Sequence, residues 1–277
     1  MNSSTSSAST VGSLLDSVDA LWPTVHAEPW DTPGLQVGSR RAHVSRVLLA
    51  VDVTPDVVSE ARAQNAEAIL AHHPLLLRGP QYLDAEGDRG KLVHELVKAN
   101  IACVAAHTNA DIVEDGVSDV IAQALELTDV EPIEPGVIGG QGLGRVGGLS
   151  TPLTLRSLAE RLESLLPATV TGIRVSGHPE AIVASVALCG GAGDSFLTHP
   201  RVISSDVYIT SDLRHHPALD ASIRSEIGCG PNLIDVSHWA SESLWLEVAA
   251  KQLRVAQPNV EFVVSSVRTD PWTFVVN

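Results

Sequence analysis

Apolar and polar positions along the chain form blocks that predict an α/β fold. Residues 47–53 and 101–106 are short aliphatic runs, which are typical of strands buried on both faces. Between them, residues 56–64 follow the helix-start signal Thr54-Pro55-Asp56, and residues 87–99 carry apolar side chains at helical spacing. This order predicts parallel strands around residues 47 and 69 that are joined by a right-handed crossover.

The second half of the chain repeats this organisation. We expect strands at 170–175, 184–189 and 207–210, helices at 154–166 and 241–253, and closing strands at 260–264 and 272–276. The pattern therefore predicts two similar α/β lobes with mixed sheets and helices packed outside. We place the first lobe at 11–127, with helices at 11–22 and 117–127, and the second lobe at 151–277.

Two stretches differ in composition from these blocks. Residues 1–10 are mostly Ser, Thr, Ala and Asn, without a cationic start or an apolar core, and we expect a disordered tail there rather than a signal peptide. Residues 128–150 are rich in Gly and Pro. The glycines at 139–148 suggest a phosphate cradle, but no Gly-Lys-Ser/Thr follows, so we favour a connection between the lobes with tight turns.

Composition narrows the class of protein. The formal net charge is -15 and the sequence pI is about 5.0, which argues against unspecific binding to nucleic acid or to anionic membranes. No apolar run approaches the ~18 to 20 residues that cross a bilayer. The three cysteines, Cys103, Cys189 and Cys229, show no metal-type pairing. We interpret them as reduced thiols in a cytoplasmic protein.

Three polar clusters follow apolar runs at predicted strand ends: His72-His73, His107 to Asp111, and His238 with Glu242. Open α/β sheets place their sites at such strand ends. Each cluster also has a structural explanation, as a satisfied core or loop histidine, a helix-capping Asp111, or a Glu242 favoured by a helix dipole. Since neighbouring residues of an extended chain point to opposite sides, we expect His72 and His73 not to hold one ion together.

Taken together, the clusters favour a metal site. Imidazoles and carboxylates without thiolates suit Zn, Fe, Mn, Co or Ni. Three imidazoles and two carboxylates exceed one open catalytic ion but fit two ions ~3.5 to 4 Å apart, and such a pair activates water. The segment His215-His216-Pro217 repeats His72-His73-Pro74 and indicates a duplication. A surface or interface role for His215 and His216 is as reasonable as a site role.

A resemblance to a known family adds to this interpretation. The chain from about Asp16 to its C-terminus resembles the GTP cyclohydrolase I type 2 family, the Nif-three-like dinuclear metal-centre hexameric proteins, in its short form. The combination of motifs is highly specific. The matching motifs are Trp30-Asp31-x-x-Gly34-Leu35-x-Val37-Gly38, Ala71-His72-His73-Pro74-Leu75, His107-Thr108-Asn109-x-Asp111, Gly142-Leu143-Gly144-Arg145 and His238-x-x-x-Glu242.

The resemblance implies a ligand set and an assembly. By position, His73 and Asp111 would bind one divalent ion, His72 and His238 the other, and Glu242 would bridge them at strand C-terminal ends between the lobes. It further implies a toroidal homohexamer. Trp239-Ala240-Ser241 precedes Glu242, where many members have an aromatic residue and Ala-Thr, and this departure leaves the ligands intact.

The implied reaction is the conversion of GTP and water to formate and 7,8-dihydroneopterin triphosphate by a metal-bound hydroxide. His107 would face the substrate or lie behind the ligands, as a proton shuttle. Two other classes stay open: a metal-dependent phosphoesterase, and a metal-binding regulatory or interaction protein without GTP turnover. A cationic lining from residues such as Arg145 or Arg214 would favour an enzyme with a nucleotide substrate.

Overall fold

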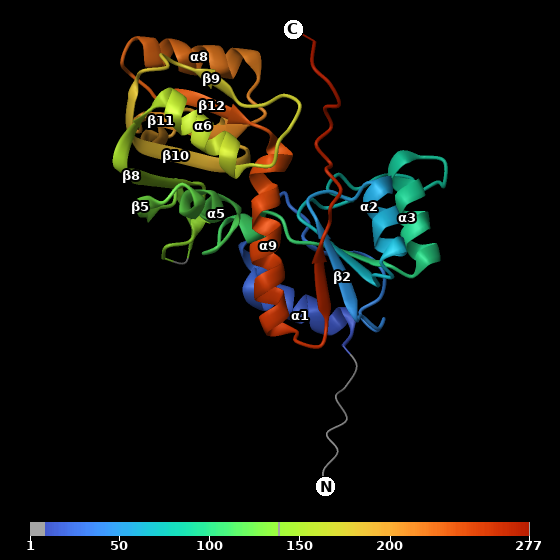
Figure 1. Ribbon diagram of the computed structural model, residues 1–277. Helices are drawn as coiled ribbons and strands as arrows, with labels where there is room; N and C mark the ends of the chain where they lie inside the picture. The colour runs from blue at the N-terminus through green and yellow to red at the C-terminus, as the bar shows by residue number, and fades with distance from the viewer. Residues whose placement is uncertain (1–8, 138, 277) are drawn as a thin grey trace. The chain divides into compact units, whose positions relative to one another are not determined.

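The computed structural model describes residues 9–137 and 139–276, and the chain divides into two compact units (Figure 1). The first unit comprises the described residues up to Ala110 together with Leu246–Thr269. The second comprises Asp111–Trp245 and the described residues from Asp270 on. These divisions differ from the expected lobes, 11–127 and 151–277.

The first unit contains a mixed sheet of five strands. Its strands lie in the order β1 (Gly34–Val37), β4 (Ala102–Ala105), β3 (Ala68–Ala71), β2 (Arg46–Ala50) and β13 (Glu261–Val264). β4, β3, β2 and β13 run parallel, and β1 is antiparallel to β4. The parallel strands are apolar throughout their buried positions, as expected for strands that are covered on both faces.

Two helices cover one face of this sheet. α2 (Pro55–Ala63) begins after Thr54, whose hydroxyl caps the helix, and α3 (Asp88–Ala99) ends at Asn100 in the left-handed conformation. Alternate strand residues and the inner sides of both helices form one apolar core. This core includes Leu48, Ala50, Val57, Val58, Ala61, Ile69, Ala71, Leu92, Leu96 and Cys103.

The other face of the first sheet lies toward α1 (Val11–Leu21) and the C-terminal half of α9 (His238–Ala256) (Figure 1). α1 begins with a capping box between Thr10 and Ser13. The amide of Gln257, just after α9, donates to the Ser13 carbonyl at 3.0 Å and to the Ser17 hydroxyl at 2.8 Å. These bonds tie the two helices together. The short helix η1 (Thr24–His26) follows α1.

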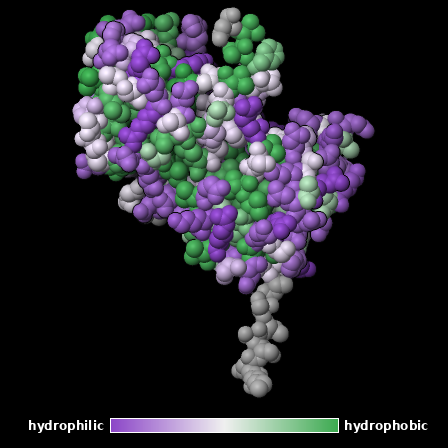
Figure 2. Space-filling view, viewed as in Figure 1, coloured by the Kyte–Doolittle hydropathy of each residue, from purple (hydrophilic) through white to green (hydrophobic). Residues whose placement is uncertain are grey.

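The C-terminal part of the chain explains the division into units. β13 pairs in parallel with β2 in the first sheet, so residues 257–269 after α9 belong to the first unit although most of that unit comes from the start of the chain. Residues 272–276 form no strand, contrary to the expectation, although Trp272, Phe274 and Val276 are apolar. All three side chains are exposed, and the apolar character of this terminal segment is visible at the top of Figure 2.

The second unit contains a mixed sheet of six strands. Their order is β5 (Leu127–Glu131), β8 (Arg145–Thr154), β10 (Ile182–Ala192), β11 (Val207–Ser211), β12 (Asn232–Val236) and β9 (Arg174–Ser176). β10, β11 and β12 are parallel, and the three outer strands are antiparallel to their neighbours.

The Gly-rich segment is part of this unit rather than a plain connection, which corrects the expectation for residues 128–150. β6 (Glu134–Pro135) pairs with β7 (Gly142–Leu143), and residues 145–148 already belong to the ten-residue strand β8. A Cβ on Gly147 would lie 2.9 Å from the Thr128 carbonyl oxygen of the neighbouring strand. The glycines therefore allow close approach of backbones within the sheet.

Helices cover both faces of the second sheet. α5 (Val117–Ala124) and α6 (Leu155–Leu165) pack with Val186, Leu188 and Ile209 in one core. α7 (Pro200–Ile203) and α8 (His215–Glu226) contribute to a core on alternate strand residues that include Ala187, Tyr208 and Leu233. α4 (Thr108–Asp111) and η2 (Asp194–Phe196) are single turns that follow strands.

Both units contain the same succession of parallel strands and crossover helices. The first runs β2-α2-β3-α3-β4, and the second runs β10-α7-β11-α8-β12, each with the three strands adjacent and in order. The predicted mixed α/β class is confirmed. Among the residues that the structure describes, no helix combines the length and apolar character needed to cross a bilayer.

Candidate metal centre

His72 and His73 follow the last residue of β3 directly. The Nδ1 atom of His72 lies 2.9 Å from the carbonyl oxygen of Ala106, to which it donates as Nδ1–H. The Nδ1 atom of His73 lies 2.7 Å from Oδ1 of Asp52. Both rings are thus oriented by partners at the ends of neighbouring parallel strands, and each would bind a metal through Nε2.

The imidazoles of His72, His73 and His107 converge. Their ring centroids are 5.1 to 5.4 Å apart, and one ligating nitrogen of each ring lies within 4.8 Å of the others. The two rings do not point to opposite sides, because β3 ends at Ala71 and both residues lie in a bend, where strand alternation no longer applies. That His72 and His73 hold no ion together stays a prediction. Three imidazoles at this spacing suit a divalent metal.

His107 is held by a buried carboxylate. Its Nδ1 atom lies 2.9 Å from Oδ1 of Asp31, whose side chain is fully buried. The second oxygen of Asp31 accepts hydrogen bonds from the amide and the hydroxyl of Thr108, at 3.0 and 2.6 Å. Burial alone would raise the pKa of Asp31, but the hydrogen bonds from His107 and Thr108 and the charge of His107 outweigh it and lower the pKa to about 2.

Asp111 closes the single turn α4, four residues after His107. A buried hydrogen bond holds this turn in place: the side-chain amide of Asn109 donates to the carbonyl oxygen of Trp22 at 2.7 Å. The Asn109 side-chain oxygen accepts from the backbone amide of His107 at 2.9 Å. Asp111 itself is half-buried. The spacing of four gives a histidine and a carboxylate on one turn, as the sequence indicates.

The second unit presents a matching pair, His238 and Glu242. His238 is the first residue of α9, and its Nε2 atom lies 2.9 Å from Oε1 of the buried Glu242. Its Nδ1 atom lies 2.7 Å from Oδ2 of Asp212, which follows β11. Burial lowers the pKa of His238, but the Glu242 and Asp212 carboxylates outweigh it and raise that pKa to about 11. This position therefore favours a cation, either a proton or a metal ion.

A glycine makes room for this pair. Gly191 of β10 has a φ of +68°, and a Cβ there would lie 2.5 Å from Glu242 Oε1 and 3.3 Å from His238 Nε2. The Gly191 amide donates to the hydroxyl of Ser241 at 2.9 Å. The backbone of β10 thus passes directly behind the two side chains, where only glycine fits without displacement.

The donor chemistry fits a divalent metal. The described clusters offer imidazole nitrogens and carboxylate oxygens, which are ligands for Zn and for other first-row transition metals. The Nδ1 atoms of His73, His107 and His238 each meet a carboxylate, and that of His72 meets a backbone carbonyl. Such partners fix the tautomer that presents Nε2 and raise the basicity of the ring.

Three aspartates that orient the imidazoles were not predicted from the sequence in that role: Asp31, Asp52 and Asp212. The sequence places Asp31 in a turn with a structural role, whereas it holds His107. Asp52 and Asp212 each follow the end of a parallel strand, at Ala50 and Ser211. The rule that pointed to the histidines, polar residues after buried strands, applies to these two aspartates as well.

The two arginines considered as a cationic lining have other roles. The Arg145 guanidinium is buried and donates to Asp119 at 2.8 Å and to the carbonyl oxygens of Gly142, Gly144 and Val113 at 2.7 to 2.9 Å. These bonds hold the β7–β8 turn in place. Arg214 is exposed and pairs with Asp194 at 2.7 Å. Arg145 therefore has a structural role.

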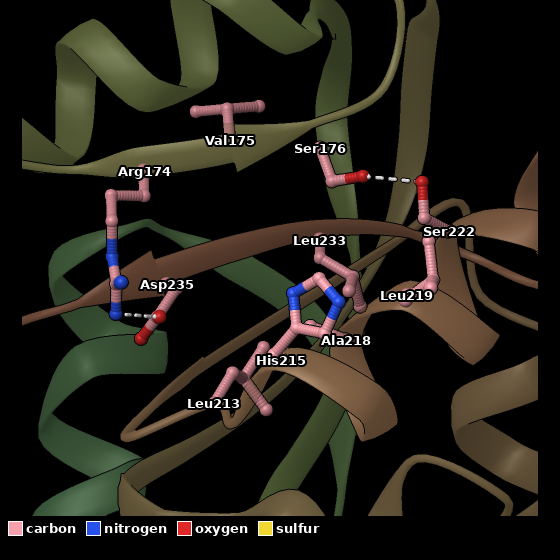
Figure 3. A pocket seen from close by; sticks show the side chains of 10 residues that line it. All are labelled: Arg174, Val175, Ser176, Leu213, His215, Ala218, Leu219, Ser222, Leu233 and Asp235. Carbon is pink, nitrogen blue, oxygen red and sulfur yellow. Dashed lines mark hydrogen bonds and ion pairs between the residues drawn. The ribbon is translucent and has the colours of Figure 1, made fainter.

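His215 and His216 lie in the first turn of α8 and belong to neither histidine cluster. Their rings contact each other, with centroids 5.1 Å apart. The first of them lines a cavity of the second unit, together with residues of β9 and β12 (Figure 3). His215-His216-Pro217 thus follows the middle parallel strand β11, as His72-His73-Pro74 follows β3. Among the described residues, it lacks the carboxylate and carbonyl partners that orient His72 and His73.

Known proteins are similar to this chain over nearly its whole length. Residues 9–271 match Duf34/NIF3 (NGG1p interacting factor 3). A Streptomyces coelicolor protein named GTP cyclohydrolase 1 type 2 homolog is 45% identical over 267 residues, which cover 94% of this chain and 92% of that protein. A Mycobacterium tuberculosis protein of the same name is 30% identical, with 94% of this chain and 95% of that protein covered.

Solved structures agree with this similarity. A Bacillus cereus protein related to NIF3 matches with a TM-score of 0.88 and 25% identity, covering 98% of this chain and all of that one. The Staphylococcus aureus protein SA1388 matches with a TM-score of 0.86 and 26% identity, covering 96% and 99% of the two chains.

Proposed function

Because the chain belongs to the Duf34/NIF3 family, we propose that it is a dinuclear divalent-metal hydrolase that converts GTP and water to formate and 7,8-dihydroneopterin triphosphate. The observation that carries the metal part is the approach of the His72 and His73 imidazoles, whose ring centroids are 5.1 Å apart and which are each held through Nδ1. The substrate part rests on relatives that are named GTP cyclohydrolase 1 type 2 homolog.

The proposed ligands are His72, His73, Asp111, His238 and Glu242. His73 and Asp111 would bind one ion, His72 and His238 would bind the other, and Glu242 would be shared by both. Support comes from each unit by itself: His72 and His73 present their Nε2 atoms together, and His238 Nε2 lies beside the Glu242 carboxylate. The ions belong to the group Zn, Fe, Mn, Co and Ni, which these ligands bind.

When bound, two such ions supply Lewis acidity and lower the pKa of coordinated water. Asp52 and Asp212 accept Nδ1–H bonds from His73 and His238 and make these rings stronger ligands. His107 is the proton shuttle, because its Nδ1 is fixed on Asp31 and its other nitrogen lies near the two ligand imidazoles. The Asp31 carboxylate accepts the Nδ1–H of His107 and holds the ring in this orientation.

Formate release tests the proposed reaction. Protein loaded separately with each candidate metal is incubated with GTP, and formate and the pteridine product are measured beside Glu242→Gln and His107→Gln variants. We expect metal-dependent formate from the wild type, loss in Glu242→Gln with reduced metal content, and a lowered rate in His107→Gln with metal content unchanged. Release of phosphate without formate would instead identify a phosphoesterase. Metal binding without turnover would indicate a regulatory or interaction protein.

The proposal includes a cytoplasmic toroidal homohexamer. Support for a reducing compartment comes from the three cysteines, which are all free. Light scattering on the purified protein tests the assembly. A mass of six chains supports the hexamer, and a stable monomer contradicts it.

A further inference from the structure

Trp30 places an exposed aromatic ring beside the histidine cluster of the first unit. The residue is 59% exposed, although tryptophan usually buries most of its large apolar surface. The ring centroids of Trp30 and His107 are 5.8 Å apart, and the two ring planes are nearly perpendicular, at 78°. The His107 ring in turn lies 5.2 Å from that of His72 and 5.4 Å from that of His73. The indole is therefore separated from two proposed metal ligands by a single imidazole.

Hydrogen bonds hold the backbone turn that carries Trp30. The Glu28 amide donates to the hydroxyl of Thr108 at 2.9 Å, and the Asp31 amide donates to the Glu28 carbonyl oxygen at 2.9 Å. The buried carboxylate of Asp31 accepts from the amide and the hydroxyl of Thr108 and meets Nδ1 of His107. These bonds fasten the turn to the start of α4. Because the turn is already ordered, a ligand that contacts the indole loses little affinity to ordering of the chain.

An exposed indole on a fixed turn is a stacking surface for a flat ring. Every nucleobase has a π-face, and stacking on an aromatic side chain changes the affinity of a base by about tenfold or more. Phosphate and carboxylate groups gain little from the same side chain, because the indole offers them one N–H donor. The position therefore favours a substrate that carries an aromatic ring.

We infer that Trp30 stacks on the purine ring of the nucleotide substrate and holds this ring beside His107. The inference rests on the proposed function and adds a residue that selects substrates with a flat ring. A base stacked on Trp30 lies next to His107, whereas the phosphates of a nucleotide are separated from the base by the ribose. The arrangement thus brings an atom of the ring, rather than a phosphate, to the imidazoles. This order of groups agrees with opening of the purine ring and disagrees with hydrolysis of a phosphate ester.

Binding of GTP and of inorganic triphosphate to the metal-loaded, full-length protein tests this inference. Calorimetry compares the wild type with Trp30→Leu, which keeps an apolar side chain without a π-face, and with Trp30→Phe, which keeps an aromatic ring. We expect GTP to bind about tenfold more weakly to Trp30→Leu and within about threefold of the wild-type affinity to Trp30→Phe. Inorganic triphosphate has no ring, so its affinity should be the same for all three proteins, as should their metal content.

Tryptophan fluorescence identifies the contact itself. A base that stacks on an indole quenches the fluorescence of that indole, so GTP should quench the wild type. At saturating GTP, this part of the quenching should be absent from Trp30→Phe, although that variant still binds GTP. Inorganic triphosphate should leave the fluorescence of all three proteins unchanged. A purely structural role of Trp30 would produce none of these differences between the two ligands.

Three results would overturn the inference: no binding of GTP to the wild type, equal GTP affinity in the wild type and Trp30→Leu, or quenching that persists in Trp30→Phe. An equal loss of affinity for GTP and inorganic triphosphate in Trp30→Leu would also overturn it, since that loss would indicate a structural role. Formate release that is independent of Trp30 would leave the proposed reaction intact. Stacking on Trp30 without any formate release would contradict only the proposed reaction.

Discussion

The imidazoles after β3, β4 and β12 are all held through Nδ1, three of them by carboxylates that follow a strand or lie in a turn. His73 meets Asp52, His107 meets Asp31, and His238 meets Asp212. A side chain with a fixed tautomer and a fixed ring plane loses little freedom when it binds a metal. At the scale of single residues, the aspartates that orient the imidazoles are therefore as important for metal binding as the histidines themselves.

Asp52→Asn tests this preparation. The amide keeps the shape of the side chain but removes the charge behind His73, so we expect metal affinity to fall about 10- to 100-fold. Competition with a chromophoric chelator measures the affinity. Asp56→Asn, an exposed change in the first turn of α2, is the control and should leave the affinity unchanged. Equal affinities for all three proteins would contradict the role given to Asp52.

Asp31 makes stability depend on acid pH. Its pKa is lowered to about 2 from an ordinary value near 3.8, so its stabilisation is complete above about pH 4 and is lost as the pH falls through 2. The difference corresponds to about 2 kcal/mol. Asp31→Asn should therefore lower the free energy of unfolding by about this amount at pH 6, and by less at pH 3.

Urea unfolding at both pH values checks this prediction. Asp220→Asn, an exposed change on α8, serves as the control and should have an effect within about 0.5 kcal/mol at either pH. A loss in Asp31→Asn that stays the same at pH 3 and pH 6 would show that the charge of Asp31 does not stabilise the fold.

At the scale of elements, the two units share a rule for placing polar residues. His107 lies two residues after the end of β4, and His238 lies two residues after the end of β12. Each is followed by a carboxylate at the fourth position, Asp111 or Glu242. In each unit, the third parallel strand, β4 or β12, is thus followed by a helical turn that carries a histidine and a carboxylate. A duplicated element would show this pattern.

Gly191→Ala tests the close passage of β10 behind His238 and Glu242. Gly172→Ala is the matched control, since Gly172 also has a positive φ, +59°, but a Cβ there meets nothing within 4 Å. Both changes should cost about 1 kcal/mol of stability from backbone strain. Only Gly191→Ala should also lower the metal content, because its methyl group displaces the Glu242 carboxylate. Unchanged metal content in Gly191→Ala would contradict this geometry.

Arg145 shows how one buried cation organises a turn. Arg145→Met should lower the free energy of unfolding by about 3 to 5 kcal/mol, because it leaves Asp119 and three carbonyl groups without their donor. Arg161→Met is the comparison, since its ion pair with the exposed Glu126 should contribute at most about 1 kcal/mol. Chemical denaturation of both variants gives the two values, and similar losses would contradict the structural role.

Much of the fold and the site could be predicted where the cause is local. The runs at 47–53 and 101–106 are apolar because both faces of the strands are covered; β4 lies within the second run, and β2 begins one residue before the first. The cap at Thr54 and the turn at Asn100 fix helix ends that can be recognised in the sequence. The polar residues after β3 and β4 indicated the histidine cluster in the same way.

The other features of the fold could not be predicted, because they depend on contacts between residues that are distant in sequence. Nothing within 261–264 shows that β13 pairs with β2, some two hundred residues earlier, so the division into units was not foreseen. The glycines of β8 have no strand propensity and are explained only by the neighbouring backbone at Thr128. Residues 272–276 have a strand-like pattern but no described strand beside them.

At the scale of the whole molecule, the proposed ligands come from both units. The first unit contributes neighbouring histidines after β3, and the second contributes His238 and Glu242 at the start of α9. Neither set alone holds two ions with three or more protein ligands each. The proposed centre therefore requires both sets.

The metal content of the purified, metal-loaded protein tests this claim most directly. Elemental analysis is made on the wild type, on His72→Ala from the first unit and on Glu242→Ala from the second, with Ile223→Trp as a control that touches neither set. We expect close to two ions per chain in the wild type and control, and fewer than one and a half in each ligand variant. Two ions retained in both variants, or no ion in the wild type under any loading, would contradict it.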